Sequence, residues 1–280
     1  MPFAVALLAV MLLLGAGANV RRSLGPVSRE RLSRFAERQR QTITAGNGNL
    51  VIAYLATTRR WRATGLLVSL LAGVVVGVRT GRLSVGALPL LSGWFAGAVV
   101  AEWRVGRPPA GERRAASLVP RVATAYLPRS ARALPLVTAG LSLVVLLVAL
   151  SLNHRPRALP LRSLALSAAM AVVLAAAARV VERRVVDRSQ PLTEPDVLAA
   201  DDAIRSRSLH VVVGATATLA LFCVSSQLSA LADAVTDTPD AARLRTLAVV
   251  TAFGGLLVGR MAALSPWAVR RHLAAAATQP

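Results

Sequence analysis

Two glutamates, each followed by an arginine, are the first residues whose types could do chemistry. Glu102 and Arg104 lie in the segment VVAEWRV, and Glu182 and Arg184 lie eighty positions later in the similar segment RVVERRVV. Each segment ends a long apolar run, so the two carboxylates could form a matched pair that lines a gate at one membrane face. The simpler interpretation is hydrated ion pairing with Arg104, Arg183 or Arg184, which contributes little energy. We favour this local pairing.

Arg260 is the one basic residue well inside an apolar run. An ionisable side chain in that setting is a candidate for function, and Glu102 or Glu182 would be its partner. A long arginine side chain about one helical turn from the membrane surface can instead extend its guanidinium to the headgroups, which is called snorkelling. The sequence favours snorkelling.

The richest polar stretch is PLTEPDVLAADDAIRSRSLH, residues 191–210. Thr193 can cap a helix, and Asp201 and Asp202 precede Arg205 by four and three residues, the spacings of ion pairs within one helix. Adjacent aspartates point to different sides of a helix, which argues against a metal site built from these two alone. We expect this helix to dock onto the preceding inner loop, RRAASLVPRVATAYLP.

Signatures of catalysis and of cofactor binding are missing from the sequence. His154, His210 and His272 have no second histidine or glutamate at ligand spacing, and the single cysteine, Cys223, lies in an apolar run. There is no phosphate-binding loop, no dinucleotide fingerprint and no paired serine and histidine. We therefore predict no metal, no cofactor and no enzymatic activity.

The elements that carry these residues are predicted to be membrane-spanning helices. An apolar fraction of 55%, 16% charged residues and a mean hydropathy of +0.56 place the chain in the membrane class. All 33 basic residues are arginines that fall between apolar runs, so the net charge of +20 does not indicate nucleic acid. Crossing the hydrocarbon core takes about 20 mostly apolar residues. Seven runs approach that length: 3–20, 63–78, 84–101, 134–152, 161–181, 209–231 and 246–264.

The predicted fold class is therefore all-α, a polytopic bundle of about seven transmembrane helices. Along the chain we expect an N-terminal transmembrane helix (1–20), a basic cytoplasmic segment (21–62), a six-helix bundle (63–272) and a tail (273–280). The bundle would consist of three helical hairpins, at about 63–101, 134–181 and 209–264.

Arginine placement predicts the side that each loop faces. Residues 21–62 hold ten arginines, 103–133 hold seven and 179–207 hold six, whereas the alternate loops hold two or three each. By the positive-inside rule the N-terminus is outside and the C-terminus is cytoplasmic, in the plasma membrane. The first run has the length of a signal peptide, but its positive charge follows the apolar core, which favours a retained anchor.

Local patterns predict how the helices are arranged. Within 21–62 an amphipathic helix with a Leu32 and Phe35 face is expected on the membrane surface, with Tyr54 and Trp61 at the interface. The sequence Asn47-Gly48-Asn49 is expected to break the chain and could cap a second short helix, Leu50–Thr57. Small residues allow helices to approach closely in lipid. They occur as the pairs Gly73 and Gly77, Gly93 and Gly97, and Gly255 and Gly259, and as the alanines 168, 169, 171, 175 and 176.

A resemblance to a known family rests on three segments: NGNLVIAYLATTRRWR, AEWRVGRPPAGERRAASLVPR and LAADDAIRSRSLH. In these segments, and over most of its length, the chain resembles uncharacterised multi-pass membrane proteins of high-GC Gram-positive bacteria. The resemblance implies a helical membrane protein and no particular activity, cofactor or site residue.

Three functions are compatible with these patterns. The first is a non-enzymatic membrane subunit, accessory or scaffold whose basic inner face binds anionic lipid headgroups or an unidentified protein, and no nucleic acid. The second is a small-solute transporter, whose pathway would need polar groups such as Thr216, Thr218, Ser225, Ser226 and Gln227. The third is a lipid-acting intramembrane enzyme, for which the inner acidic residues match no catalytic spacing. We favour the first.

Overall fold

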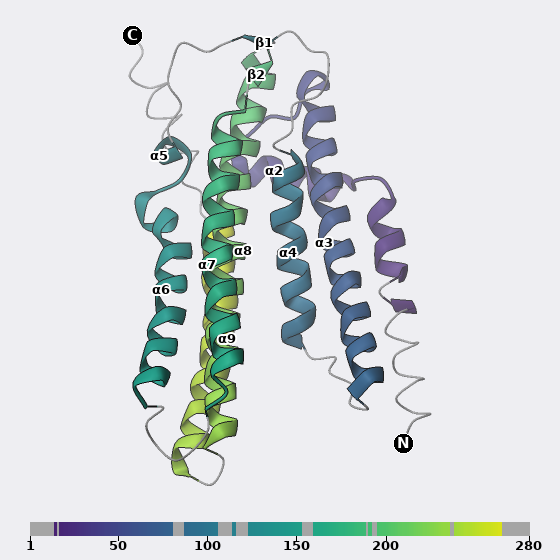
Figure 1. The fold of residues 1–280 in the computed structure, drawn as a ribbon. Helices are drawn as coiled ribbons and strands as arrows, with labels where there is room; N and C mark the ends of the chain where they lie inside the picture. The colour runs from purple at the N-terminus through teal and green to yellow at the C-terminus, as the bar shows by residue number, and fades with distance from the viewer. Residues whose placement is uncertain are drawn as a thin grey trace. The chain divides into compact units, whose positions relative to one another are not determined.

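The computed structural model describes residues 14–15, 17–80, 87–105, 114–115, 123–152, 159–188, 190–191, 195–235 and 238–264. Helices form almost all of this part of the chain (Figure 1). They belong to two compact units, each assembled from segments that are far apart in sequence. Unit 1 comprises Met1–Pro128, Val181–Leu209 and Pro266–Pro280, and unit 2 comprises Arg129–Val180 and His210–Ser265.

Five helices in the described part are long and apolar enough to cross a membrane. They are α3 (Ala45–Thr80), α6 (Arg129–Leu152), α7 (Leu161–Val186), α8 (Pro195–Ala234) and α9 (Pro239–Leu264). Each contains one of the predicted runs. A further helix, α4 (Ala87–Val105), covers most of the run 84–101 but is not among the five. The run 3–20 lies largely outside the described residues. The described part of the chain is therefore all-α with five candidate spans.

One continuous helix replaces the break predicted at Asn47-Gly48-Asn49. α3 runs for 36 residues. The backbone N–H of Asn47 donates to the Thr44 hydroxyl oxygen at 3.2 Å, and the backbone N–H of Thr44 donates to Asn47 Oδ1 at 2.9 Å. This reciprocal bonding resembles a capping box, which satisfies amide groups left without partners in a first helical turn. Asn47 therefore lies in the first turn of α3, and the predicted short helix and the second predicted span are one element.

The amphipathic helix expected around Leu32 and Phe35 forms as α2 (Arg29–Gln39). Its apolar face contacts protein, and its position at the membrane surface stays a prediction. Phe35 is buried in a cluster with Tyr54 of α3 and Ile204 of α8, and Leu32 packs against the same cluster. Burial of this face leaves the arginines of α2 on its exposed side.

Glycine allows α3 and α4 to pack with their backbones in contact, as Figure 1 shows for their side-by-side arrangement. A Cβ atom added to Gly93 would collide with the carbonyl oxygen of Gly65, and one added to Gly97 with that of Trp61. The predicted pair Gly93 and Gly97 thus does mediate helix packing. Its partner on α3, Gly65, belongs to none of the predicted pairs.

Unit 2 packs through small residues too. Gly255 and Gly259 of α9 face α8, where a Cβ on Gly214 would lie 2.7 Å from the Gly259 carbonyl oxygen. Along α7, the buried alanines are 168, 171, 175 and 178, whereas the predicted alanines 169 and 176 are exposed. Large apolar side chains such as Phe253 and Met261 are 64% and 73% exposed, as expected of a surface that contacts lipid.

A two-residue strand pair and a one-turn helix lie in the loops of unit 1. Strand β1 (Arg114–Ala115) pairs antiparallel with β2 (Gln190–Pro191). The one-turn helix α5 (Ala123–Tyr126) follows β1. Residues between α4 and α6 are thereby brought to the segment that precedes α8.

Candidate functional site

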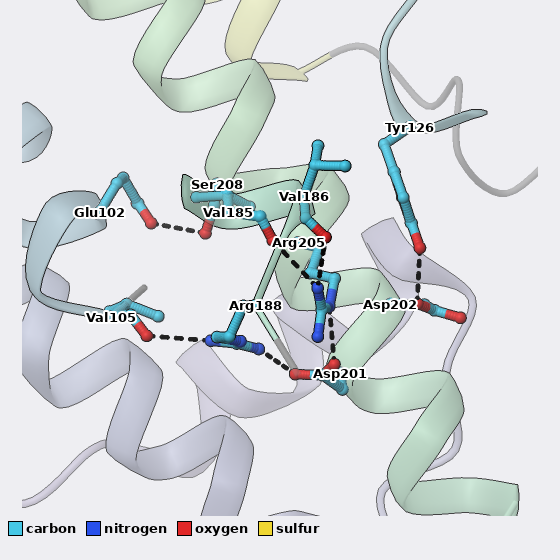
Figure 2. A network of polar contacts seen from close by, with 10 residues as sticks. All are labelled: Glu102, Val105, Tyr126, Val185, Val186, Arg188, Asp201, Asp202, Arg205 and Ser208. Atoms are coloured by element: carbon cyan, nitrogen blue, oxygen red, sulfur yellow. Dashed lines mark hydrogen bonds and ion pairs between the residues drawn. The ribbon is translucent and has the colours of Figure 1, made fainter. Parts of the chain in front are cut away.

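Asp201 is the centre of a buried charge network at the start of α8. Its side chain accepts a hydrogen bond from Arg205 Nε at 2.8 Å and forms an ion pair with Arg188 (Figure 2). The Asp201 and Arg205 side chains are 3% and 0% exposed. The predicted ion pair of Asp201 with Arg205 is therefore confirmed, and a second arginine, Arg188, joins it.

Both arginines hold the C-terminal ends of other helices. Arg205 donates to the carbonyl oxygens of Val185 and Val186 at the end of α7, at 3.0 and 3.2 Å. Arg188 donates to the carbonyl oxygen of Val105, the last residue of α4, at 2.9 Å. The last four carbonyls of a helix have no partner within it, and the helix dipole attracts positive charge there. One carboxylate thus fixes two cations, each of which caps a helix.

The electrostatics of Arg188 agree with this structural role. Burial lowers the pKa of the Arg188 guanidinium, and the neighbouring Asp201 carboxylate opposes that effect. An arginine starts from so high a pKa that it remains charged at neutral pH. Asp201 therefore faces a permanent positive charge.

Asp202, next to Asp201, points to a different contact, as expected of adjacent positions on a helix. It accepts a hydrogen bond from the Tyr126 hydroxyl at 3.0 Å, and the Ser206 hydroxyl donates to the Tyr126 backbone carbonyl at 3.2 Å. Together with the pairing of β1 and β2, these bonds confirm that the start of α8 docks onto the preceding loop. Thr193, the predicted cap, lies outside the described residues.

Glu102 is fully buried, which corrects the prediction of a hydrated side chain that pairs with neighbouring arginines. The Ser208 hydroxyl donates to its Oε2 at 2.6 Å, and the Tyr54 hydroxyl donates to its Oε1 at 3.2 Å. The prediction was wrong because α3 extends well beyond its predicted start. Its added turns bring Tyr54, which is buried, to Glu102 near the end of α4.

The other three residues of the two similar segments, Glu182, Arg104 and Arg184, have different surroundings. Glu182 is only 4% exposed, so it too is not hydrated. The guanidinium of Arg104 lies 5.0 Å from the centre of the Trp61 ring, and that of Arg184 lies 4.2 Å from the Trp103 ring. Cations over aromatic faces are stabilised by the ring quadrupole. Arg104 and Arg184 are thus held by tryptophans.

A cavity of about 550 Å³ lies in unit 1, within the range of small-molecule sites. Seven of its sixteen lining residues are arginines, and none is acidic. Four of these arginines are exposed: Arg22, Arg31, Arg34 and Arg38. The other three are half-buried: Arg59, Arg62 and Arg207. Tyr54, Phe35 and Trp94 add aromatic surface.

The arginines of the cavity differ in how they are held. Arg59 donates to the backbone carbonyls of Ser23, Gly25 and Pro26, so it ties α3 to the preceding turn. Arg34 forms an exposed ion pair with Glu30 at 3.0 Å. The Arg62 guanidinium lies 4.8 Å from the centre of the Trp94 ring. Its buried Nε has no hydrogen-bond partner within the described part of the chain.

Sequence reasoning missed this cavity because it divided α3 into two pieces. Tyr54, Thr58 and Arg62 follow one another at intervals of four, the spacing of one helix face. That signal becomes visible only when residues 45–80 are considered as one helix. The contributions of Arg207 and Trp94 come from distant elements, and no local pattern indicates them.

The remaining candidates are structural in character. Arg260 is exposed on α9. Of the five polar residues considered for a transport pathway, Ser226 is exposed and the others bond to helix backbone. Gln227 bridges Ser142 of α6 and Leu164 of α7 with bonds of 2.9 to 3.2 Å. Among the described residues no group of three His, Cys, Asp or Glu could hold a metal ion. His154 and His272 lie outside those residues.

Comparisons with known proteins found no match to a family model, to a curated protein or to a solved structure. The function must therefore be inferred from the residues themselves.

Proposed function

We propose that this chain is a non-enzymatic membrane subunit or scaffold of the plasma membrane, with a basic cytoplasmic face that binds anionic lipid headgroups. In this proposal the protein has seven transmembrane helices, including α4 and the run 3–20, with its N-terminus outside. A protein that docks on the same face is the second kind of partner.

The observation that carries the proposal is a contrast between buried polar side chains, which bond within the protein, and exposed arginines. Buried Asp201, Arg205 and Glu102 hold helix ends and helix pairs together, and Gln227 does so within unit 2. By contrast, most arginines between 21 and 40 are exposed. An exposed arginine near an anionic leaflet contributes about 1 kcal/mol of attraction. These arginines therefore supply binding energy to an acidic surface.

The test is lipid analysis of protein purified from native membranes in mild detergent. We expect anionic lipids to be enriched over their share of the bulk membrane. Replacing Arg21, Arg29 and Arg60 by glutamine removes three exposed charges that do not line the cavity, and it should lower the enrichment several-fold. The matched control is R243Q/R245Q, which removes exposed arginines from the loop assigned to the other side. Equal retention of anionic lipid by all three proteins would refute the proposal.

A further inference from the structure

We infer that the arginine-lined cavity of unit 1 is a binding site for a phosphate-bearing ligand with at least two negative charges. This inference deepens the proposed function and rests on it in one respect, because it gives one anionic ligand of the basic face a defined pocket. The exposed arginines outside the cavity have no part in it.

The charge of the cavity is the first argument. Its lining contains seven arginines and no acid, and a concave surface of one sign concentrates the electric field. Three charges are partly offset. Arg34 pairs with Glu30, and Glu102 lies behind Tyr54, close enough to Arg62 and Arg207 to interact electrostatically. Arg22, Arg31, Arg38 and Arg207 form no ion pair with a described carboxylate. A large positive excess therefore faces the cavity.

Arg62 supplies the second argument. A buried donor without an acceptor is unfavourable by about 1 to 3 kcal/mol, and by more when it is charged. Arg62 Nε is such a donor within the described residues, on a guanidinium whose position is held by the Trp94 ring. This atom has almost no accessible surface, so an acceptor oxygen in the cavity would bind the part of the guanidinium that lines it. The planar guanidinium forms two parallel bonds to phosphate, which explains why arginine suits this ligand.

Size and polarity indicate more than a bare ion. The lining of this cavity of about 550 Å³ includes the apolar side chains of Phe35, Leu55, Ala63 and Trp94. Apolar lining suits the organic part of a phosphate ester, while the arginines suit its phosphate. A lipid headgroup and a soluble phosphorylated compound share this chemistry.

Calorimetric titration of the full-length protein in neutral detergent tests the inference with two probes. One probe is inorganic pyrophosphate, and the other is dihexanoyl phosphatidic acid, with dihexanoyl phosphatidylcholine as the uncharged comparison. The variants are R62Q and R31Q/R38Q. The control is R29Q/R60Q, whose exposed arginines lie on the same two helices but do not line the cavity. R31Q/R38Q changes only exposed side chains of α2, so it remains informative if R62Q does not fold.

We expect the wild-type protein to bind at least one anionic probe, and R62Q and R31Q/R38Q each to bind about tenfold more weakly or worse. R29Q/R60Q should stay within about twofold of wild type, because charges outside the cavity are screened. Binding of pyrophosphate indicates that phosphate alone suffices, and binding of phosphatidic acid alone identifies a lipid headgroup. Absence of binding, or equal weakening in all three variants, overturns the inference.

The two proposals fail separately. Anionic lipid enrichment without a cavity-dependent titration leaves the membrane-face function standing and removes the cavity site. A cavity-dependent titration with pyrophosphate, without lipid enrichment in native membranes, retains the site and removes the lipid-binding function.

Discussion

At the residue scale, Asp201 has the largest consequences for stability. It is nearly inaccessible and compensates two arginines whose side chains are 12% and 0% exposed. Removing one member of a buried ion pair leaves an uncompensated charge, which is far more unfavourable than losing an exposed pair. Exposed pairs contribute little because solvent screens them.

We predict that Asp201→Asn lowers the free energy of unfolding by about 3 to 5 kcal/mol, as measured by thermal or denaturant unfolding in detergent. The control is Asp240→Asn, whose partner Arg243 is 78% exposed. That change should lower stability by less than about 1 kcal/mol. Similar losses in the two variants would show that the Asp201 network does not stabilise the fold.

Arg260 is expected to behave as a snorkelling residue. Arg260→Leu should insert normally and keep its melting temperature close to that of wild type, because the side chain is exposed. Glu102→Ala should lower the melting temperature, because Tyr54 and Ser208 lose their acceptor. Combining the two changes should give additive losses. If the double variant instead regains the yield lost by the single ones, Arg260 and Glu102 form a pair.

At the element scale, close backbone approach determines how the helices pack. Gly65 and Gly93 illustrate this, since neither position has room for a Cβ atom. In lipid, helices associate through van der Waals contact and hydrogen bonds rather than through hydrophobic burial. Separating two backbones by one methyl group therefore removes much of their attraction.

Gly65→Ala should destabilise the protein by about 1 to 3 kcal/mol, because α3 and α4 must move apart. Gly140→Ala on α6 is the control, since an added Cβ meets nothing within 4 Å there. It should be neutral or stabilising by up to about 1 kcal/mol, because alanine favours a helix. Melting temperatures of the two variants in one detergent decide the matter, and a Gly65→Ala protein as stable as wild type contradicts the packing described.

The helices themselves could largely be predicted from the sequence, because an apolar run of sufficient length has few alternatives in lipid. The start of α3 could not be predicted, because asparagine is common both in helix caps and in turns that interrupt a helix. Only the bond between Thr44 and the Asn47 side chain shows that a helix begins here. The ion pair of Asp201 with Arg205 follows from helical spacing. The backbone carbonyls that Arg188 and Arg205 bind could not be predicted from spacing, because they depend on which helix ends the fold brings together.

At the scale of the whole molecule, the side of the membrane that each loop faces determines which partners it can bind. The loops rich in arginine alternate with loops that hold few, and the last of the latter also carries Asp233 and Asp240. Translocation of arginine is disfavoured, and the proposed topology places the arginine-rich loops on the cytoplasmic side for that reason.

Cysteine labelling tests that topology in a Cys223→Ala background, since Cys223 is the single native cysteine. Ser33→Cys on α2 and Asp240→Cys at the start of α9 both replace exposed residues. In intact cells a membrane-impermeant maleimide should label Asp240→Cys and leave Ser33→Cys unlabelled until the cells are opened. The reverse pattern would invert the orientation, and labelling of both before lysis would contradict the seven-span arrangement.

The caps on α4 and α7 also have a consequence for biosynthesis. The carbonyl oxygen of Val105 is satisfied by Arg188, which follows it by 83 residues, and those of Val185 and Val186 wait for Arg205. At about 5 to 20 residues per second, the ribosome needs roughly 4 to 17 s to reach Arg188 after Val105. Until then the carbonyl oxygen of Val105 needs another hydrogen-bond donor, such as water. The cap that α4 has in the folded protein therefore depends on a segment that is synthesised later.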